Sequence, residues 1–132
     1  MSIVEEAVRD KLLSDSAVSA LVSERVYASE LPQKPTYPAI IYEHVDSERD
    51  FTMEGPSGFV TTTMEIRVYA SSYSGVKDLA TKIRQVLNGL DDMILGVKIL
   101  GIFLQNESDD FDEDLDVNIS ILDYSVNHDE VV

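Results

Sequence analysis

The densest group of side chains able to do chemistry is an acidic segment spanning residues 107–116. It holds seven carboxylates in ten residues, and carboxylate oxygens are ligands that Ca²⁺ prefers. The alternating aspartates that begin at Asp110 fit the start of the helix-loop-helix calcium pattern. The rest does not fit, because Leu115 stands where the pattern needs glycine and Ile121 where it needs a bidentate glutamate. We therefore expect a solvated turn between two strands, and no metal or cofactor site.

The two histidines, His44 and His128, are the only imidazoles in the chain. Each is far in sequence from any partner that would make it a general base, so we expect surface or packing histidines. The Gly-Pro-Ser-Gly run at 55–58 lacks the spacing of a nucleophile elbow and is typical of a tight turn. We therefore expect no catalytic residue and no enzyme activity.

The charge balance separates the possible classes of partner. The chain has 132 residues, with 25 acidic against 10 basic ones and a formal net charge of -15. Such a charge opposes non-specific binding to DNA, RNA or an anionic membrane, which are themselves negatively charged. No cysteine is present, which excludes disulfides, thiolate zinc sites and a cysteine nucleophile. We expect neither a secretory signal nor a membrane span, since the N-terminus is acidic and Lys98 interrupts the longest apolar segment.

Helical periodicity occurs near the N-terminus and in the middle of the chain. Apolar residues recur at helical spacing over Ile3–Leu13, and Asp15 or Ser16 can cap a short helical turn after it. The strongest pattern is a continuous apolar stripe over Val76–Leu90, preceded by hydroxyl residues and ended by Asn88-Gly89. This pattern predicts a long helix lying on a sheet.

Strand patterns surround that helix. The central stretch, Leu31–Tyr73, holds three of the four prolines and two strand-like runs, Ala39–Val45 and Phe59–Tyr69, which we expect a long polar loop at Asp46–Gly58 to join. Three further strands are predicted at Arg25–Ala28, Val97–Leu104 and Leu115–Val126. In the last of these the apolar positions change phase after Ile121, which either a bulge or two buried faces would explain.

These elements predict a two-layer α+β domain. About five strands would form a mostly antiparallel or mixed sheet, packed by one long helix, with a shorter N-terminal helical region. We expect residues 1–132 to form a single domain and Asn127–Val132 to be a loose tail.

Several short pieces of sequence also occur in a characteristic order. They are Arg25-Val26-Tyr27, Leu31-Pro32-Gln33, Tyr37–Tyr42, Ser47–Asp50, Glu54–Gly58 and Arg67-Val68-Tyr69-Ala70, followed by the helix Tyr73–Leu90 and the strand containing Ile102–Gln105. In this order they resemble the tail completion family of long-tailed bacteriophages, the tail terminator or tail-to-head joining proteins. The resemblance covers nearly the whole chain and depends on the order of the pieces, none of which is a catalytic motif.

The resemblance implies a structural virion protein of a phage or prophage. Such a subunit assembles as a ring, typically a hexamer, at the head-proximal end of the tail tube, where it stops tube growth and joins the tail to the head connector. Its partners would be its own copies, the tail tube protein and the head connector, with DNA passing through the channel. It would reside at the head-tail junction of the virion, and in the host cytoplasm during assembly. Candidate assembly contacts are Arg49, Asp50, Phe51 and Glu54.

A second hypothesis comes from a different class of protein. The segment at 107–116 could make the chain a cytosolic binding module that takes a divalent cation or a basic protein. A dedicated calcium site would give stoichiometric binding, whereas a solvated loop would give only weak, salt-screened binding.

Overall fold

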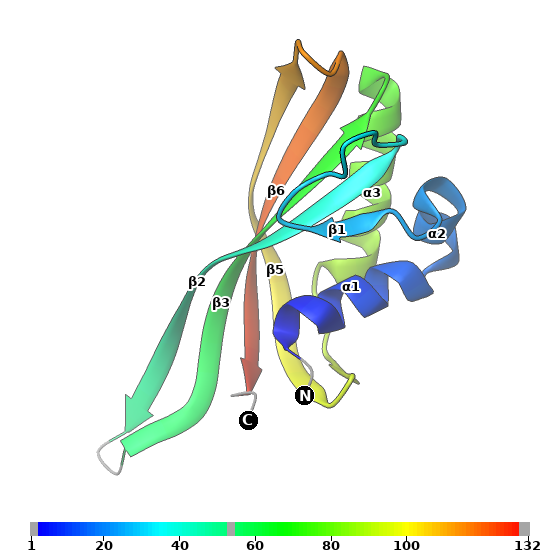
Figure 1. Cartoon of the computed structure of the whole chain (residues 1–132). Helices are drawn as coiled ribbons and strands as arrows, with labels where there is room; N and C mark the ends of the chain where they lie inside the picture. Colours follow the sequence, from blue (N-terminus) through cyan, green and yellow to red (C-terminus); the bar gives the residue numbers. More distant parts are fainter. Residues whose placement is uncertain (1–2, 53–54, 130–132) are drawn as a thin grey trace.

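The computed structural model describes residues 3–52 and 55–129, with side chains described outside residues 50–57. In chain order the elements are α1 (Val4–Ser14), α2 (Ser16–Val22), β1 (Val26–Ala28), β2 (Ala39–Thr52), β3 (Gly55–Ala70), α3 (Tyr73–Leu87), β4 (Asp92–Ile94), β5 (Val97–Asp112) and β6 (Val117–Asp129). Figure 1 shows the helices gathered on one side of a strongly twisted sheet. No helix in these ranges is long and apolar enough to span a membrane.

The sheet is mixed and has the strand order β1-β2-β3-β6-β5-β4. Only the β1–β2 pair is parallel, and the other four pairs are antiparallel. The predicted α+β class and mixed sheet are confirmed. The described part contains six strands instead of about five, because the short β4 at Asp92–Ile94 was not expected, and α1 and α2 are two separate helices.

The long helix forms where its apolar stripe predicted it. Five residues of the stripe are buried against the sheet: Val76, Leu79, Ala80, Ile83 and Leu87. The Ser72 hydroxyl caps the start of α3 by accepting a hydrogen bond from the Gly75 N–H at 3.0 Å. The helix ends at Leu87, and Gly89 follows with φ +82°, a left-handed conformation that glycine adopts without strain.

Burial on both faces of the sheet explains the change of phase in β6. Leu122, Tyr124 and Val126 pack into the main core under the helices. Val117 and Ile119 belong to a smaller cluster on the opposite face, which the proline-containing segment covers through Leu31 and Tyr37. The register between β3 and β6 is continuous, so no bulge is needed on that side. Register shifts lie instead between β5 and β6, at Ile99/Gly101 and at Leu104/Asn106.

Three expectations about loops were wrong. The segment Asp46–Gly58 is not a polar loop, because β2 continues to Thr52 and β3 begins at Gly55. The acidic segment is not mainly a turn, because β5 continues to Asp112 and only residues 113–116 form the turn. Asn127–Asp129 are the end of β6 and not part of a tail, and residues 130–132 lie outside the described ranges. In each case antiparallel pairing with a neighbouring strand satisfies the backbone of a polar segment.

Candidate assembly site

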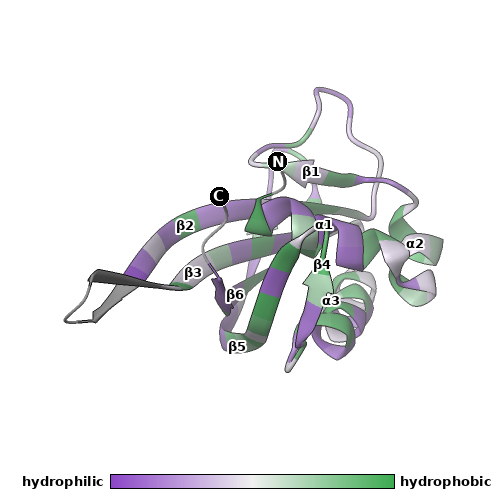
Figure 2. Cartoon of the chain, turned by 90° about the horizontal axis from the view of Figure 1, so that it is seen from below, coloured by the Kyte–Doolittle hydropathy of each residue, from purple (hydrophilic) through white to green (hydrophobic). Residues whose placement is uncertain are grey.

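Three of the four candidate contact residues lie on a two-stranded arm. We use "arm" for residues 46–52 of β2 and 55–60 of β3, which Figure 2 shows reaching away from the helices. Arg49 is exposed on β2 opposite Val60 of β3. Asp50 is also a β2 residue, and Phe51 pairs with Pro56 across the arm. Glu54 lies outside the described residues, so the structure places three of the four candidates on one strand.

Register pairing with β3 holds the first half of the arm in place. Asp46, Ser47 and Glu48 pair with three consecutive threonines, Thr63, Thr62 and Thr61. Threonine favours strands because its branched side chain packs well on a pleated surface. The register shifts between His44 and Asp46, so Val45 is an extra, bulged residue with 54% of its surface exposed. The bulge changes which face of β2 the following side chains occupy.

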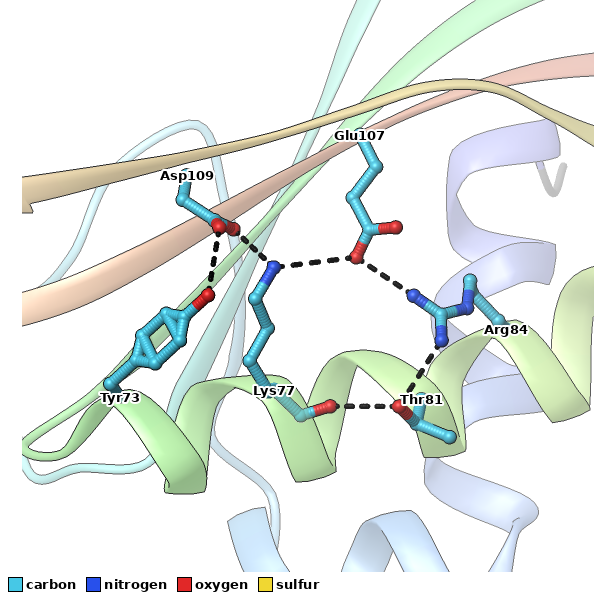
Figure 3. Close-up of polar contacts among 6 residues, drawn as sticks. All are labelled: Tyr73, Lys77, Thr81, Arg84, Glu107 and Asp109. Carbon is cyan, nitrogen blue, oxygen red and sulfur yellow. Dashed lines mark hydrogen bonds and ion pairs between the residues drawn. The ribbon is translucent and has the colours of Figure 1, made fainter.

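The acidic strand β5 is tied to α3 by a network of charged side chains (Figure 3). The Lys77 ammonium contacts Asp109 Oδ1 at 2.6 Å and Glu107 Oε1 at 3.8 Å. Arg84 donates to the same Glu107 oxygen at 2.8 Å. Tyr73 Oη donates to Asp109 Oδ2 at 3.4 Å, and Lys77 Nζ lies 5.6 Å from the centre of the Tyr73 ring. The basic side of the helix thus neutralises part of the acidic segment.

Titration behaviour follows from this network. The hydrogen bond from Lys77 lowers the pKa of Asp109, and the same contact raises the pKa of Lys77. Both side chains are partly exposed, so the pair contributes little to stability. The network joins β5 to α3 through partly exposed contacts.

The acidic segment does not gather its carboxylates around a point. Its first residues lie along an extended strand, and Glu107 and Asp109 already face cations. Among the residues that the structure describes, no group of three histidine, aspartate or glutamate side chains could hold a metal ion. The cation-binding hypothesis therefore gains no geometric support.

The two histidines lie close together, which the sequence did not indicate. His44 Nε2 is 2.7 Å from Ser47 Oγ, which is 2.9 Å from Thr62 Oγ1. Thr62 Oγ1 is in turn 2.7 Å from His128 Nε2. His44 is exposed and His128 is buried, and the strand order β2-β3-β6 connects them although they are far apart in sequence.

The fold is that of a mixed α+β domain with a projecting arm, and comparison with known proteins specifies the family. The family model described as Tail completion protein gp17 matches residues 6–129, so the chain belongs to that family. This is a family of structural phage tail proteins.

A solved structure described as the virion of a native gene transfer agent particle contains a chain with the same fold. The TM-score is 0.75 at 18% sequence identity, and the alignment covers 96% of this chain and 94% of that one. No curated protein matches the sequence. Both positive comparisons associate the fold with virion components.

Proposed function

We propose that the protein assembles as a ring, typically a hexamer, at the head-proximal end of a phage tail tube, where it stops tube growth and joins the tail to the head connector. The observation that carries this proposal is the tail completion family match over residues 6–129. The virion neighbour supports it, because the two chains share their fold over nearly their full lengths. The protein would work in the virion after assembly in the host cytoplasm, and without a catalytic step.

The two long outer edges of the sheet suit a protein that assembles. β1 covers β2 only as far as Tyr42, so the outer edge of β2 from Glu43 to Thr52 has no strand partner in the described chain. β4 covers β5 only at Val97–Ile99. Residues 88–89 bond to the backbone of β5 at Ile102 and Leu104. From there to Asp112, no strand among the described residues pairs with this edge. Open strand edges are sites where further chains add, unless charge or cover prevents it.

Charge controls which contacts these edges can make. Six copies at -15 each would carry a formal charge of -90, which is a strong repulsion between subunits at low ionic strength. We therefore expect ring formation to need salt, or a tube or connector surface that supplies positive charge. The same negative charge would keep DNA from adhering to the wall of a channel.

The arm is the proposed contact surface between subunits or with neighbouring rings. Its candidate residues are Arg49, Asp50, Phe51 and Glu54, which combine a cation, two acids and an aromatic ring in six positions. An aromatic flanked by charges is a frequent composition at protein contacts. Because β3 pairs along β2 up to Thr52, Arg49, Asp50 and Phe51 would lie on a two-stranded support.

The acidic segment is not proposed as a cation site. Two of its carboxylates are engaged by α3, and the remainder do not converge. No specific observation favours the alternative of a cytosolic binding module.

A capping assay tests the proposal. Purified tail tube protein is polymerised with and without this protein, and tube lengths are measured by electron microscopy. We expect tubes that stop growing when the protein is added, with density at one end only. Phe51→Ser should weaken this capping, whereas Met93→Ser, which changes an exposed apolar residue with 60% of its surface accessible on β4, should not. Unchanged tube growth with the wild-type protein would contradict the proposal.

A further inference from the structure

We propose that His44, Ser47, Thr62 and His128 form a proton-transfer chain across β2, β3 and β6, linking an exposed imidazole to a buried one. The three contacts measure 2.7, 2.9 and 2.7 Å in that order. A fourth contact of 2.7 Å joins His128 Nδ1 to the backbone oxygen of Asp129. Thr62 is 1% exposed and His128 4%, whereas His44 is exposed.

Two features of the sheet bring the four side chains onto one face. Residues three apart on a regular strand point to opposite faces, but the bulge at Val45 returns Ser47 to the face of His44. Ser47 pairs directly with Thr62 in the β2–β3 register. His128 pairs with Val60, two positions from Thr62, which places His128 diagonally across the β3–β6 pair.

The backbone carbonyl at Asp129 determines which group donates in each hydrogen bond of the proton-transfer chain when both histidines are neutral. A carbonyl only accepts, so His128 Nδ1 carries a hydrogen and Nε2 is an acceptor. Thr62 must then donate to His128, Ser47 must donate to Thr62, and His44 must donate from Nε2. Each of the three bonds holds one hydrogen.

A proton that binds at His44 Nδ1 can reach His128 without diffusing there. His44 passes its Nε2 hydrogen to Ser47, Ser47 passes its own hydrogen to Thr62, and Thr62 passes its own to His128 Nε2. The result is a charged His128 and a neutral His44 with its hydrogen on Nδ1. Three hydrogens still fill three bonds, every one of which now runs in the opposite direction.

The number of hydrogens also opposes the state in which both histidines are charged. With a hydrogen on both Nε2 atoms, four hydrogens share three hydrogen bonds, and one hydroxyl hydrogen has no acceptor among these four side chains. Burial of Thr62 makes such an unmade bond unfavourable. The chain therefore couples the two imidazoles: the charge on His128 determines which nitrogen of a neutral His44 carries the hydrogen.

The surroundings contain both signs of charge. The four side chains line a hollow of about 220 Å³ together with Glu5 of α1 and Arg49 of β2. Glu6 of α1 and Glu43 of β2 lie on the adjoining surface next to His44. Asp129 follows His128 on β6, whereas β3 and β5 contribute the uncharged Val60 and Ile99 as register partners of His128. A metal ion shared by the two imidazoles does not fit, because two hydroxyl groups stand between them.

Imidazole ¹⁵N NMR of the full chain across the histidine titration range tests the proposal, because the Nδ1 and Nε2 shifts report tautomer and charge separately. We expect the His44 resonances to show two steps, one from its own protonation and one from that of His128. Ser47→Ala and Thr62→Val should abolish the second step. Thr61→Val is the matched control, since its hydroxyl bonds Asn127 across the same two strands but on the other face.

Two results would overturn the proposal. One is a wild-type His44 that titrates in a single step and ignores the charge on His128. The other is a Ser47→Ala protein that keeps both steps, which would show that the coupling passes through space and not through the hydroxyl groups. Ser47 is only half-buried, so this variant keeps the test available if the change at Thr62 impairs folding.

Discussion

Replacing Tyr124 by phenylalanine should stabilise the protein, although Tyr124 is one of the largest fully buried side chains. Its ring is 1% exposed in the main core, and no hydrogen-bond partner for the hydroxyl is found among the described residues. A buried polar group without a partner costs about 1–3 kcal/mol, and phenylalanine keeps the shape of the ring. We expect Tyr124→Phe to gain about 1 kcal/mol in free energy of unfolding, or roughly 4 °C in Tm.

Alkaline pH should widen the difference in free energy of unfolding between the wild type and Tyr124→Phe. Burial raises the pKa of Tyr124, because the phenolate is disfavoured in the core. A group whose folded-state pKa is raised contributes stability that is complete below its unfolded pKa of about 10 and is lost as pH rises above it. The wild type should therefore lose about 1.4 kcal/mol per pH unit relative to the variant above pH 10. The pKa values of Tyr37 and Tyr69 are also raised, but both residues are present in both proteins, so their effects on the stability difference cancel.

Urea unfolding followed by circular dichroism measures both effects. Wild type and variant are compared at one protein concentration, because self-association would add to apparent stability. Tyr73→Phe is the control, since Tyr73 is 54% exposed and its replacement should change stability little. The reasoning fails if Tyr124→Phe destabilises the protein at neutral pH, or if its stability falls above pH 10 as steeply as that of the wild type.

Three further changes test the network, a helix cap and the core. Asp109→Asn should cost less than about 1 kcal/mol at neutral pH, because the contact with Lys77 is partly exposed. The difference should shrink as pH falls below the ordinary aspartate pKa, because the contact that lowers the pKa of Asp109 is lost when the folded carboxylate takes up a proton. A loss that persists in acid would contradict this. Ser72→Ala should cost about 1 kcal/mol by removing the cap of α3, measured by thermal unfolding, and no change would show that the cap is dispensable. Leu122→Ala should cost about 2–5 kcal/mol, because Leu122 is fully buried. Leu115→Ala at the exposed turn should cost little, and similar losses at both sites in urea unfolding would contradict the assigned core.

The sequence predicted those elements whose own pattern determines their structure. The long helix has a complete apolar stripe, so α3 was found together with its capping region and its stop at Asn88-Gly89. The buried half of β5 was recognised for the same reason. The phase change in β6 was seen, but only the structure shows that clusters on both faces of the sheet cause it.

Elements that depend on distant partners could not be predicted locally. The arm and the acidic half of β5 are polar and largely exposed, so neither shows the alternation that identifies a half-buried strand. Pairing with β3 and β6, and for β5 the contacts of Lys77 and Arg84, hold these segments extended. The hydrogen-bonded series from His44 to His128 was missed because it requires a bulge at Val45 and the placement of β3 between β2 and β6. Its sequence signal is limited to Ser47, three residues after His44, and to the threonine run at residues 61–63.

Electron microscopy of the concentrated protein, imaged over a range of salt concentrations, tests the proposed role most directly. We predict closed rings with a central hole, more abundant as salt screens the repulsion between the acidic subunits. Particles that remain single subunits at every salt and protein concentration, together with tubes that keep growing in their presence, would contradict the proposal that this chain forms the ring that ends a tail.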